Sequence, residues 1–116
     1  MPDKPTNLLF YSAFAQPAKE TNWRPPADVY RTRTGWLLKF ELAGVQLDDI
    51  SVSVMGSIVT VSGVRRDRIV EEDCWHYSME ISYNKFERTI HLPCDVSTND
   101  LSLEYKNGLL LVRVNV

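Results

Sequence analysis

An Asn-Gly pair between two stretches of alternating apolar and polar residues constrains this chain most. Residues 101–106 read LSLEYK, with an apolar side chain at every second position, which is the period of a strand with one buried face. Asn107-Gly108 follows and predicts a hairpin, because a two-residue type I′ turn needs positive φ at both central positions. Residues 109–116, LLLVRVNV, form the returning strand. Apolar residues on both faces near its start indicate that this strand is covered on two sides.

Short segments with the same alternation recur along the rest of the chain. We expect strands at residues 27–30, 36–42, 50–54, 58–64, 79–83 and 86–92. The alternation changes phase at Asn84-Lys85, which predicts a bulge or bend there. A turn at Gly56-Ser57 joins two of these strands into a second hairpin. About seven to eight short strands, closely spaced turns and no convincing helix together predict an all-β antiparallel sandwich.

Length and charge exclude several classes of protein. The 116 residues suffice for one domain, and a net charge of −2 with interspersed basic and acidic residues argues against a nucleic-acid surface. No apolar run approaches the length that spans a membrane. The first residues do not follow the pattern of a signal peptide, so we expect a cytoplasmic protein in which Cys74 and Cys94 are free thiols.

Residues 1–22 are expected to form an N-terminal arm outside the domain at residues 23–116. Prolines at positions 2, 5 and 17 interrupt regular structure in the arm. The arm nevertheless contains apolar side chains that a fully solvated tail would not need, namely Leu8, Leu9, Phe10, Tyr11 and Phe14. They either pack on the domain as a short helix or contact other subunits or other proteins.

A long polar connection separates two of the expected strands. It begins with RRDRIVEED at residues 65–73, which has a basic half and an acidic half. Ile69, Val70 and Trp75 are apolar residues within it. The connection is either a solvated loop or an arm that pairs with the sheet edge of another subunit. Across a two-fold axis, the basic half of one arm would face the acidic half of the partner's arm.

Motifs of enzyme active sites and metal sites are missing from the sequence. It contains neither a glycine-rich phosphate-binding loop nor a G-x-S-x-G nucleophile motif. The cysteines and histidines do not have the spacing of metal ligands. Cys74 and His76 are close in sequence, but a Cys-His nucleophile also needs a third orienting group and a pocket. His91 is expected at the surface of a strand. We therefore expect neither an enzyme nor a bound cofactor or metal.

Four short motifs, in this order, resemble those of the small heat-shock protein (alpha-crystallin) family. They are PPADVY at residues 25–30, FELAGV at 40–45, the F-x-R and L-P motifs within 86–93, and YKNGLL at 105–110. Each motif alone is weak, whereas four in the right order and spacing are specific. The similarity covers about residues 23–116 and fits the bacterial, archaeal and plant-type members.

The sequence departs from the family pattern at several positions. Ala43 and Leu103 replace the usual proline and alanine. Ile81 follows Glu80 where many members have an arginine, so a family ion pair across the dimer is not expected. The sequence ends at Val116, without the I-x-I/V motif that usually lies beyond the last strand. On this ground we expect a dimer rather than a large shell.

The resemblance implies an immunoglobulin-like β-sandwich and the ATP-independent holding of unfolding proteins. In the family, an extra strand within the long connection pairs with the partner's sheet and makes the dimer. The residues expected at this dimer interface are Ile69, Val70, Trp75, Tyr77 and Glu80. The family also has an apolar groove between two strands, and the residues expected to line it and bind clients are Ile50, Val52, Val54, Leu101 and Leu103. The alternative is that these side chains fill the core, which we expect of at least half of them.

Two functions from different classes follow. The first is a holdase chaperone whose partners are non-native client proteins and copies of itself, as a homodimer or a larger homo-oligomer, with no nucleic acid and no membrane. The second is an adaptor like the related CS-domain cochaperones, which are usually monomeric and bind one defined partner. The connection at residues 65–77 distinguishes the two, since a dimer supports the first and a monomer the second.

Overall fold

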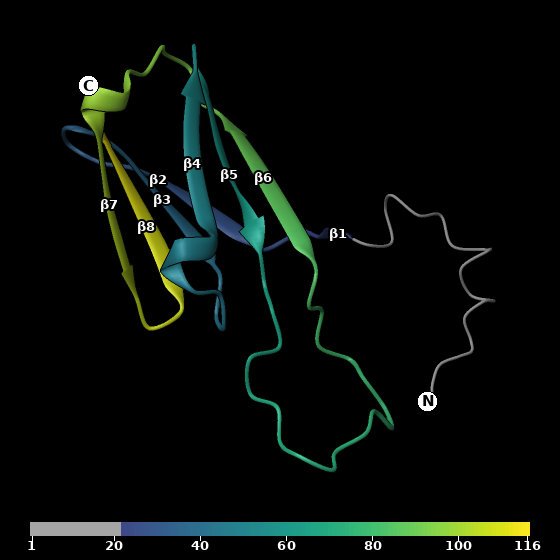
Figure 1. The fold of residues 1–116 in the computed structure, drawn as a ribbon. Helices are drawn as coiled ribbons and strands as arrows, with labels where there is room; N and C mark the ends of the chain where they lie inside the picture. Colours follow the sequence, from purple (N-terminus) through teal and green to yellow (C-terminus); the bar gives the residue numbers. More distant parts are fainter. Residues whose placement is uncertain (1–21) are drawn as a thin grey trace.

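Two four-stranded β-sheets pack face to face in residues 22–116, the part of the chain that this computed structural model describes (Figure 1). The first sheet has the order β1 (Asn22–Trp23), β6 (Lys85–His91), β5 (Ile58–Val64) and β4 (Ile50–Met55). The second has the order β2 (Ala27–Arg31), β3 (Gly35–Glu41), β8 (Leu109–Asn115) and β7 (Leu101–Lys106). Short 3₁₀ turns, η1 (Leu47–Asp49) and η2 (Thr98–Asp100), precede β4 and β7. The predicted all-β sandwich is confirmed.

The core lies between the sheets, because every second side chain of a strand turns toward the opposite sheet. In β3 these are Leu38 and Phe40, and in β5 they are Val59 and Val61, all fully buried. The other inward-facing buried side chains of the strands are Phe86, Ile90, Leu110, Val112 and Val114. Removing one such side chain from water contributes about 1.5–3 kcal/mol to folding. Within residues 22–116, no polar or charged residue is buried among them.

The β7–β8 hairpin has the turn that was predicted at Asn107-Gly108. φ is 53° at Asn107 and 78° at Gly108, as a type I′ turn requires. Lys106 pairs with Leu109 across the turn. β4 and β5 form the second predicted hairpin.

The returning strand β8 is buried on both faces near its start, as predicted. Leu111 points outward and yet is only 9% exposed. Its neighbours in register are Lys39 of β3 and Glu104 of β7, and long side chains of this kind can cover apolar surface with their aliphatic parts. Arg113 and Lys106 hold the Glu104 carboxylate in ion pairs at 3.0 and 3.5 Å. The hydrogen bond from Arg113 is the main reason that the pKa of Glu104 is lowered.

β1 attaches the beginning of the described chain to the first sheet. It pairs in parallel with β6, and is the exception to the antiparallel pairing of the described strands. The Trp23 ring packs edge-on against the buried Phe86 ring, at 5.4 Å between centroids. The arm residues Leu8, Leu9, Phe10 and Phe14 lie outside the described residues, so their contacts stay a prediction.

The strand expected at residues 79–83 is not formed, which corrects the prediction. β6 begins at Lys85, and the whole connection at residues 65–84 is irregular and extends away from the sandwich (Figure 1). Of the bulge or bend expected at Asn84-Lys85, the bulge has no strand to interrupt, whereas the chain does bend at Asn84. The alternation of Met79 and Ile81 fits a strand, but a strand also needs a neighbour that satisfies its backbone groups.

Candidate interaction surfaces

Exposed apolar side chains are concentrated in the connection at residues 65–84. They are Ile69, Val70, Trp75, Tyr77, Met79 and Ile81. Trp75 is 75% exposed and Tyr77 is fully exposed, so neither contributes to the core. Single exposed apolar residues are common on proteins, but a group of them on one projecting segment is a candidate surface for interaction. The sequence indicated the first four of them, and Glu80, the fifth expected interface residue, is also exposed.

Arg65 joins the two ends of this connection where they leave the sandwich, a place that we call the neck. Its Nε donates to the Ser82 carbonyl oxygen at 2.8 Å, and its Nη1 donates to the Ala43 carbonyl oxygen at 3.2 Å. The guanidinium carbon lies 3.7 Å from the centre of the Trp23 ring, a cation–π contact. The backbone N–H of Arg65 donates to the Asn84 carbonyl oxygen at 3.1 Å. One residue thus joins both ends of the connection to the sandwich.

Asp49, at the end of η1, binds the next two arginines. Its Oδ2 accepts hydrogen bonds from Arg68 Nη2 at 3.1 Å and from Arg66 Nε at 3.2 Å. The hydrogen bond from Arg68, followed by that from Arg66, lowers the pKa of Asp49. The sequence had suggested that these arginines face the acidic half of a partner's arm, whereas both have an acidic partner in their own chain. Nothing local in the sequence singles out Asp49, because 17 residues separate it from Arg66.

β2 is an outer strand of the second sheet. Among the described strands it pairs with β3 alone, so the backbone groups of its other edge have no strand partner. Val29 and Tyr30 on this strand are 44% and 43% exposed. Lys39 Nζ lies 4.7 Å from the centre of the Tyr30 ring. An edge of this kind can pair with an added strand.

The five predicted groove residues lie on β4 and β7, the last strands of the two sheets, which run along the same side of the sandwich (Figure 1). Four of them, Ile50, Val52, Val54 and Leu101, are half-buried and pack against the core. Leu103 is 53% exposed. The structure therefore brings the five together at one side of the sandwich. Most of them pack partly against the core and are partly exposed to solvent.

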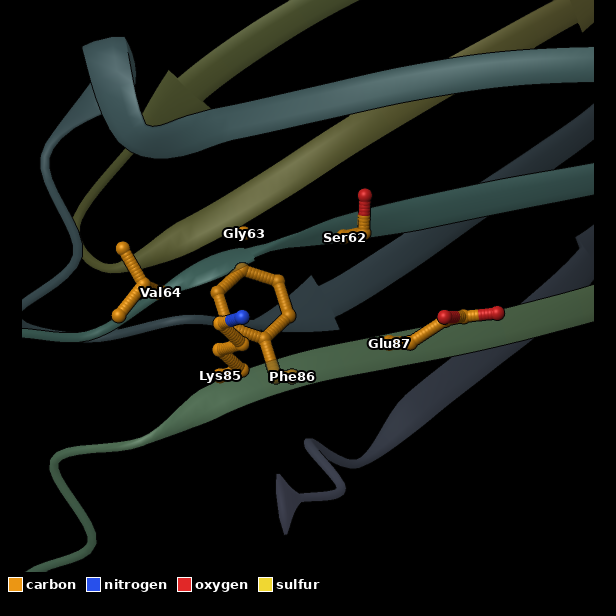
Figure 2. A pocket seen from close by; sticks show the side chains of 6 residues that line it. All are labelled: Ser62, Gly63, Val64, Lys85, Phe86 and Glu87. Carbon is orange, nitrogen blue, oxygen red and sulfur yellow. The ribbon is translucent and has the colours of Figure 1, made fainter. Parts of the chain in front are cut away.

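A hollow of about 480 Å³ lies over β5 and β6. Figure 2 shows the residues that line it, Ser62, Gly63, Val64, Lys85, Phe86 and Glu87, with the Phe86 ring beside Gly63. A Cβ at Gly63 would lie 2.9 Å from that ring, so the ring occupies the space of the missing side chain. The described lining includes neither a histidine nor a cysteine.

The residues considered for chemistry from the sequence are dispersed. Cys74, His76 and His91 are exposed, and Cys94 is half-buried. Neither cysteine forms a disulfide within residues 22–116. In the same range, no group of three or more His, Cys, Asp or Glu side chains could hold a metal ion. The described helical turns are also far too short to cross a membrane.

Comparisons with known proteins agree with this architecture. The profile of the Hsp20/alpha crystallin family matches residues 28–116. Small heat shock protein C2 of Rickettsia felis is 27% identical over 105 residues, covering 90% of this chain and 68% of the relative. Spore protein SP21 of Stigmatella aurantiaca is 32% identical over 106 residues, covering 91% of this chain and 63% of the relative. The chain thus spans about two thirds of the length of these relatives.

Solved structures are similar over most of the described residues. HSP18.5 from E. histolytica superposes with a TM-score of 0.69 at 30% identity, over 80% of this chain and 88% of that one. Heat shock protein 16.0 from Schizosaccharomyces pombe gives 0.70 at 25% identity, over 80% and 86% of the two chains. Because the family profile covers most of the sequence and the sandwich matches solved members, the chain belongs to the Hsp20/alpha crystallin family.

Proposed function

We propose that the protein is an ATP-independent holdase that binds unfolding proteins and prevents their aggregation. Membership of the small heat-shock protein family supports a chaperone role rather than an enzymatic one. The observation that carries the proposal is the row of half-exposed apolar side chains along β4 and β7. An unfolding protein exposes apolar segments and unpaired strands, and an apolar row between two strand edges can cover both. A cytoplasmic location stays a prediction from the sequence.

We further propose that two copies associate through the connection at residues 65–84. The support is its group of exposed apolar side chains, together with an outer edge of β2 that has no described strand partner. Trp75 is the largest of these side chains, and a buried aromatic residue often dominates the energy of an interface. Pairing of the connection with a partner's β2 edge would also give Met79 and Ile81 a strand neighbour, which they do not have within the described part of one chain.

The client site is tested by comparing two glutamate substitutions on neighbouring residues of β7. Leu103→Glu places a charge on the apolar row, whereas Ser102→Glu places the same charge on the opposite face of the strand. Both residues are exposed, so both variants should fold. We expect Leu103→Glu to lose most of the protection of a heat-unfolding client enzyme without ATP, and Ser102→Glu to keep it.

The readout is light scattering of the client at several chaperone ratios, with circular dichroism as the folding control. Equal protection by the two variants would exclude the β4–β7 row as the client site. A parent protein that protects no client at any ratio would overturn the holdase function itself.

A further inference from the structure

Three basic residues surround the neck of the connection at residues 65–84, and each is bound to the sandwich. Arg65 contacts Trp23 and Ala43, while Arg66 and Arg68 share the Asp49 carboxylate. We call these three arginines the collar. Trp23 is in β1, Ala43 follows β3, and Asp49 ends η1, so the collar contacts the sandwich at three separate places.

The ring that holds Arg65 belongs to the packed part of the molecule. The Trp23 ring under the guanidinium packs edge-on against Phe86, which is 3% exposed. An arginine can use its planar face for the ring and its edge for two carbonyl oxygens at the same time, which a lysine cannot do. Arg65 therefore fixes the direction in which the chain leaves β5.

The anchor of Arg66 and Arg68 is equally confined. The backbone carbonyl oxygen of Asp49 lies over the Cα of Gly63, so close that a Cβ there would be 1.9 Å away. The backbone N–H of Asp49 donates to the Gln46 carbonyl oxygen at 2.8 Å. With its backbone held on both sides, the Asp49 carboxylate is a fixed point to which the first turn of the connection is bound.

Beyond the collar, the connection is largely exposed to solvent. Each residue from 66 to 81 is exposed. The contacts of the collar therefore set the direction in which the segment from Ile69 to Ile81 projects from the sandwich. A segment that is already directed toward its binding position loses less conformational entropy on association.

We propose that the collar and Asp49 orient the connection and thereby set the strength with which two copies associate. This inference rests on the proposed association through the connection. Arg65 and Asp49 are positioning residues, because they act through the direction of the segment that carries Trp75. Loss of the collar should weaken association while the sandwich stays folded.

The variants are Asp49→Asn, which keeps the shape but removes the charge, and Arg65→Lys, which keeps the charge but removes the planar fork. Asp48→Asn is the matched control, since Asp48 lies in the same turn, is exposed and forms no ion pair in the described part of the chain. In a sedimentation dilution series, Asp49→Asn and Arg65→Lys should each raise the dissociation constant about three- to tenfold. Asp48→Asn should leave it unchanged.

The direction of the connection is measured separately by the distance between two spin labels. One label is attached to the native Cys74 in the connection and the other to Ser102→Cys on β7, in a Cys94→Ser background. Labelled chains are mixed with an excess of unlabelled chains, so that each distance lies within one chain. We expect a narrow distance distribution for the parent and for Asp48→Asn, and a broad one for Asp49→Asn and Arg65→Lys, with unchanged circular dichroism.

A distribution that stays narrow in both collar variants would overturn the inference, because the collar would not direct the connection. A distribution that broadens without any rise in the dissociation constant would overturn it as well. Failure of the proposed interface has a different signature, namely a dissociation constant that Trp75→Ala does not change.

Discussion

Asn107 and Gly108 show how a single turn depends on residue type. Both have positive φ, which costs little for asparagine and nothing for glycine, but is strained for β-branched residues. Gly108 also packs against the turn that follows β3, since a Cβ at position 108 would lie 3.0 Å from the Cβ of Ala43. Its carbonyl oxygen accepts a hydrogen bond from the Leu42 N–H at 2.7 Å. Conformation and packing thus favour glycine at this position.

Gly108→Val is therefore expected to lower the free energy of unfolding by about 1–3 kcal/mol. The measurement is the urea midpoint, with Asn107→Gly as the control that keeps positive φ accessible and should change stability little. If Gly108→Val unfolds like the parent, backbone strain does not limit this turn.

Tyr105 makes a contact that local patterns do not reveal. Its hydroxyl lies 2.7 Å from the Leu42 carbonyl oxygen and 2.6 Å from the Val45 carbonyl oxygen, joining β7 to the turn after β3. Burial raises the pKa of this tyrosine. The alternation of residues 101–106 predicts that Tyr105 turns inward, whereas the two carbonyl oxygens are about 60 residues away in the sequence.

At the scale of elements, the connection at residues 65–84 differs from the strands around it. Each strand has a neighbour in register, and the central strands of the two sheets also have one face against the core. The connection has the apolar residues of a strand but lies outside both sheets. Its acidic residues Glu71, Glu72 and Asp73 are exposed, and exposed ion pairs contribute only about 0–1 kcal/mol each. Apolar anchors should therefore dominate any association through it.

Trp75→Ala is expected to weaken association far more than Glu72→Ala, because burial of a large aromatic side chain at an interface contributes about 2 kcal/mol or more. Both side chains are exposed in the single chain, so neither substitution should alter the sandwich. Analytical ultracentrifugation over a dilution series measures the effect, and circular dichroism checks the fold. Dissociation of both variants at the parent's concentration would mean that the connection is only a solvated loop.

At the scale of the whole molecule, the sandwich has a projecting segment at one end of β5 and β6 and an outer edge along β2 (Figure 1). If the segment of each copy pairs with the β2 edge of the other, the contact is the same on both sides. In such a two-fold arrangement both projecting segments are paired, so no unpaired segment is left to bind a further copy. Larger assemblies would need other surfaces, such as the β4–β7 row or the N-terminal arm.

We accordingly expect a dimer as the smallest stable species in sedimentation velocity at micromolar concentrations. Removal of residues 1–21 should leave this dimer intact, because the proposed contact lies within residues 22–116. A monomer at all concentrations would instead favour an adaptor of the CS-domain type, and loss of the dimer with the arm would locate the contact in the arm.

The sequence by itself determined those features that depend on neighbours in the chain. The period of two at residues 101–106 and the requirement for positive φ at Asn107-Gly108 are local properties, and they predicted the hairpin and its inward face. The same alternation in the other short segments, with closely spaced turns between them, predicted the sandwich. The exposed residues Ile69, Val70 and Trp75 could be proposed as a surface for the same reason, because they are apolar within a polar segment. Tyr77 was expected at this surface only from the family resemblance.

Only the tertiary structure decided which distant groups meet. Residues 79–83 alternate like a strand, yet they form none, because they pair with no strand of either sheet in the described part of the chain. Arg66 and Arg68 bind Asp49 rather than remaining free for a partner's acidic residues. The guanidinium of Arg65 packs on the ring of Trp23, which is far from it in the sequence. Pairings of this kind depend on how the sheets stack and where their ends lie, and no local pattern of residues encodes that.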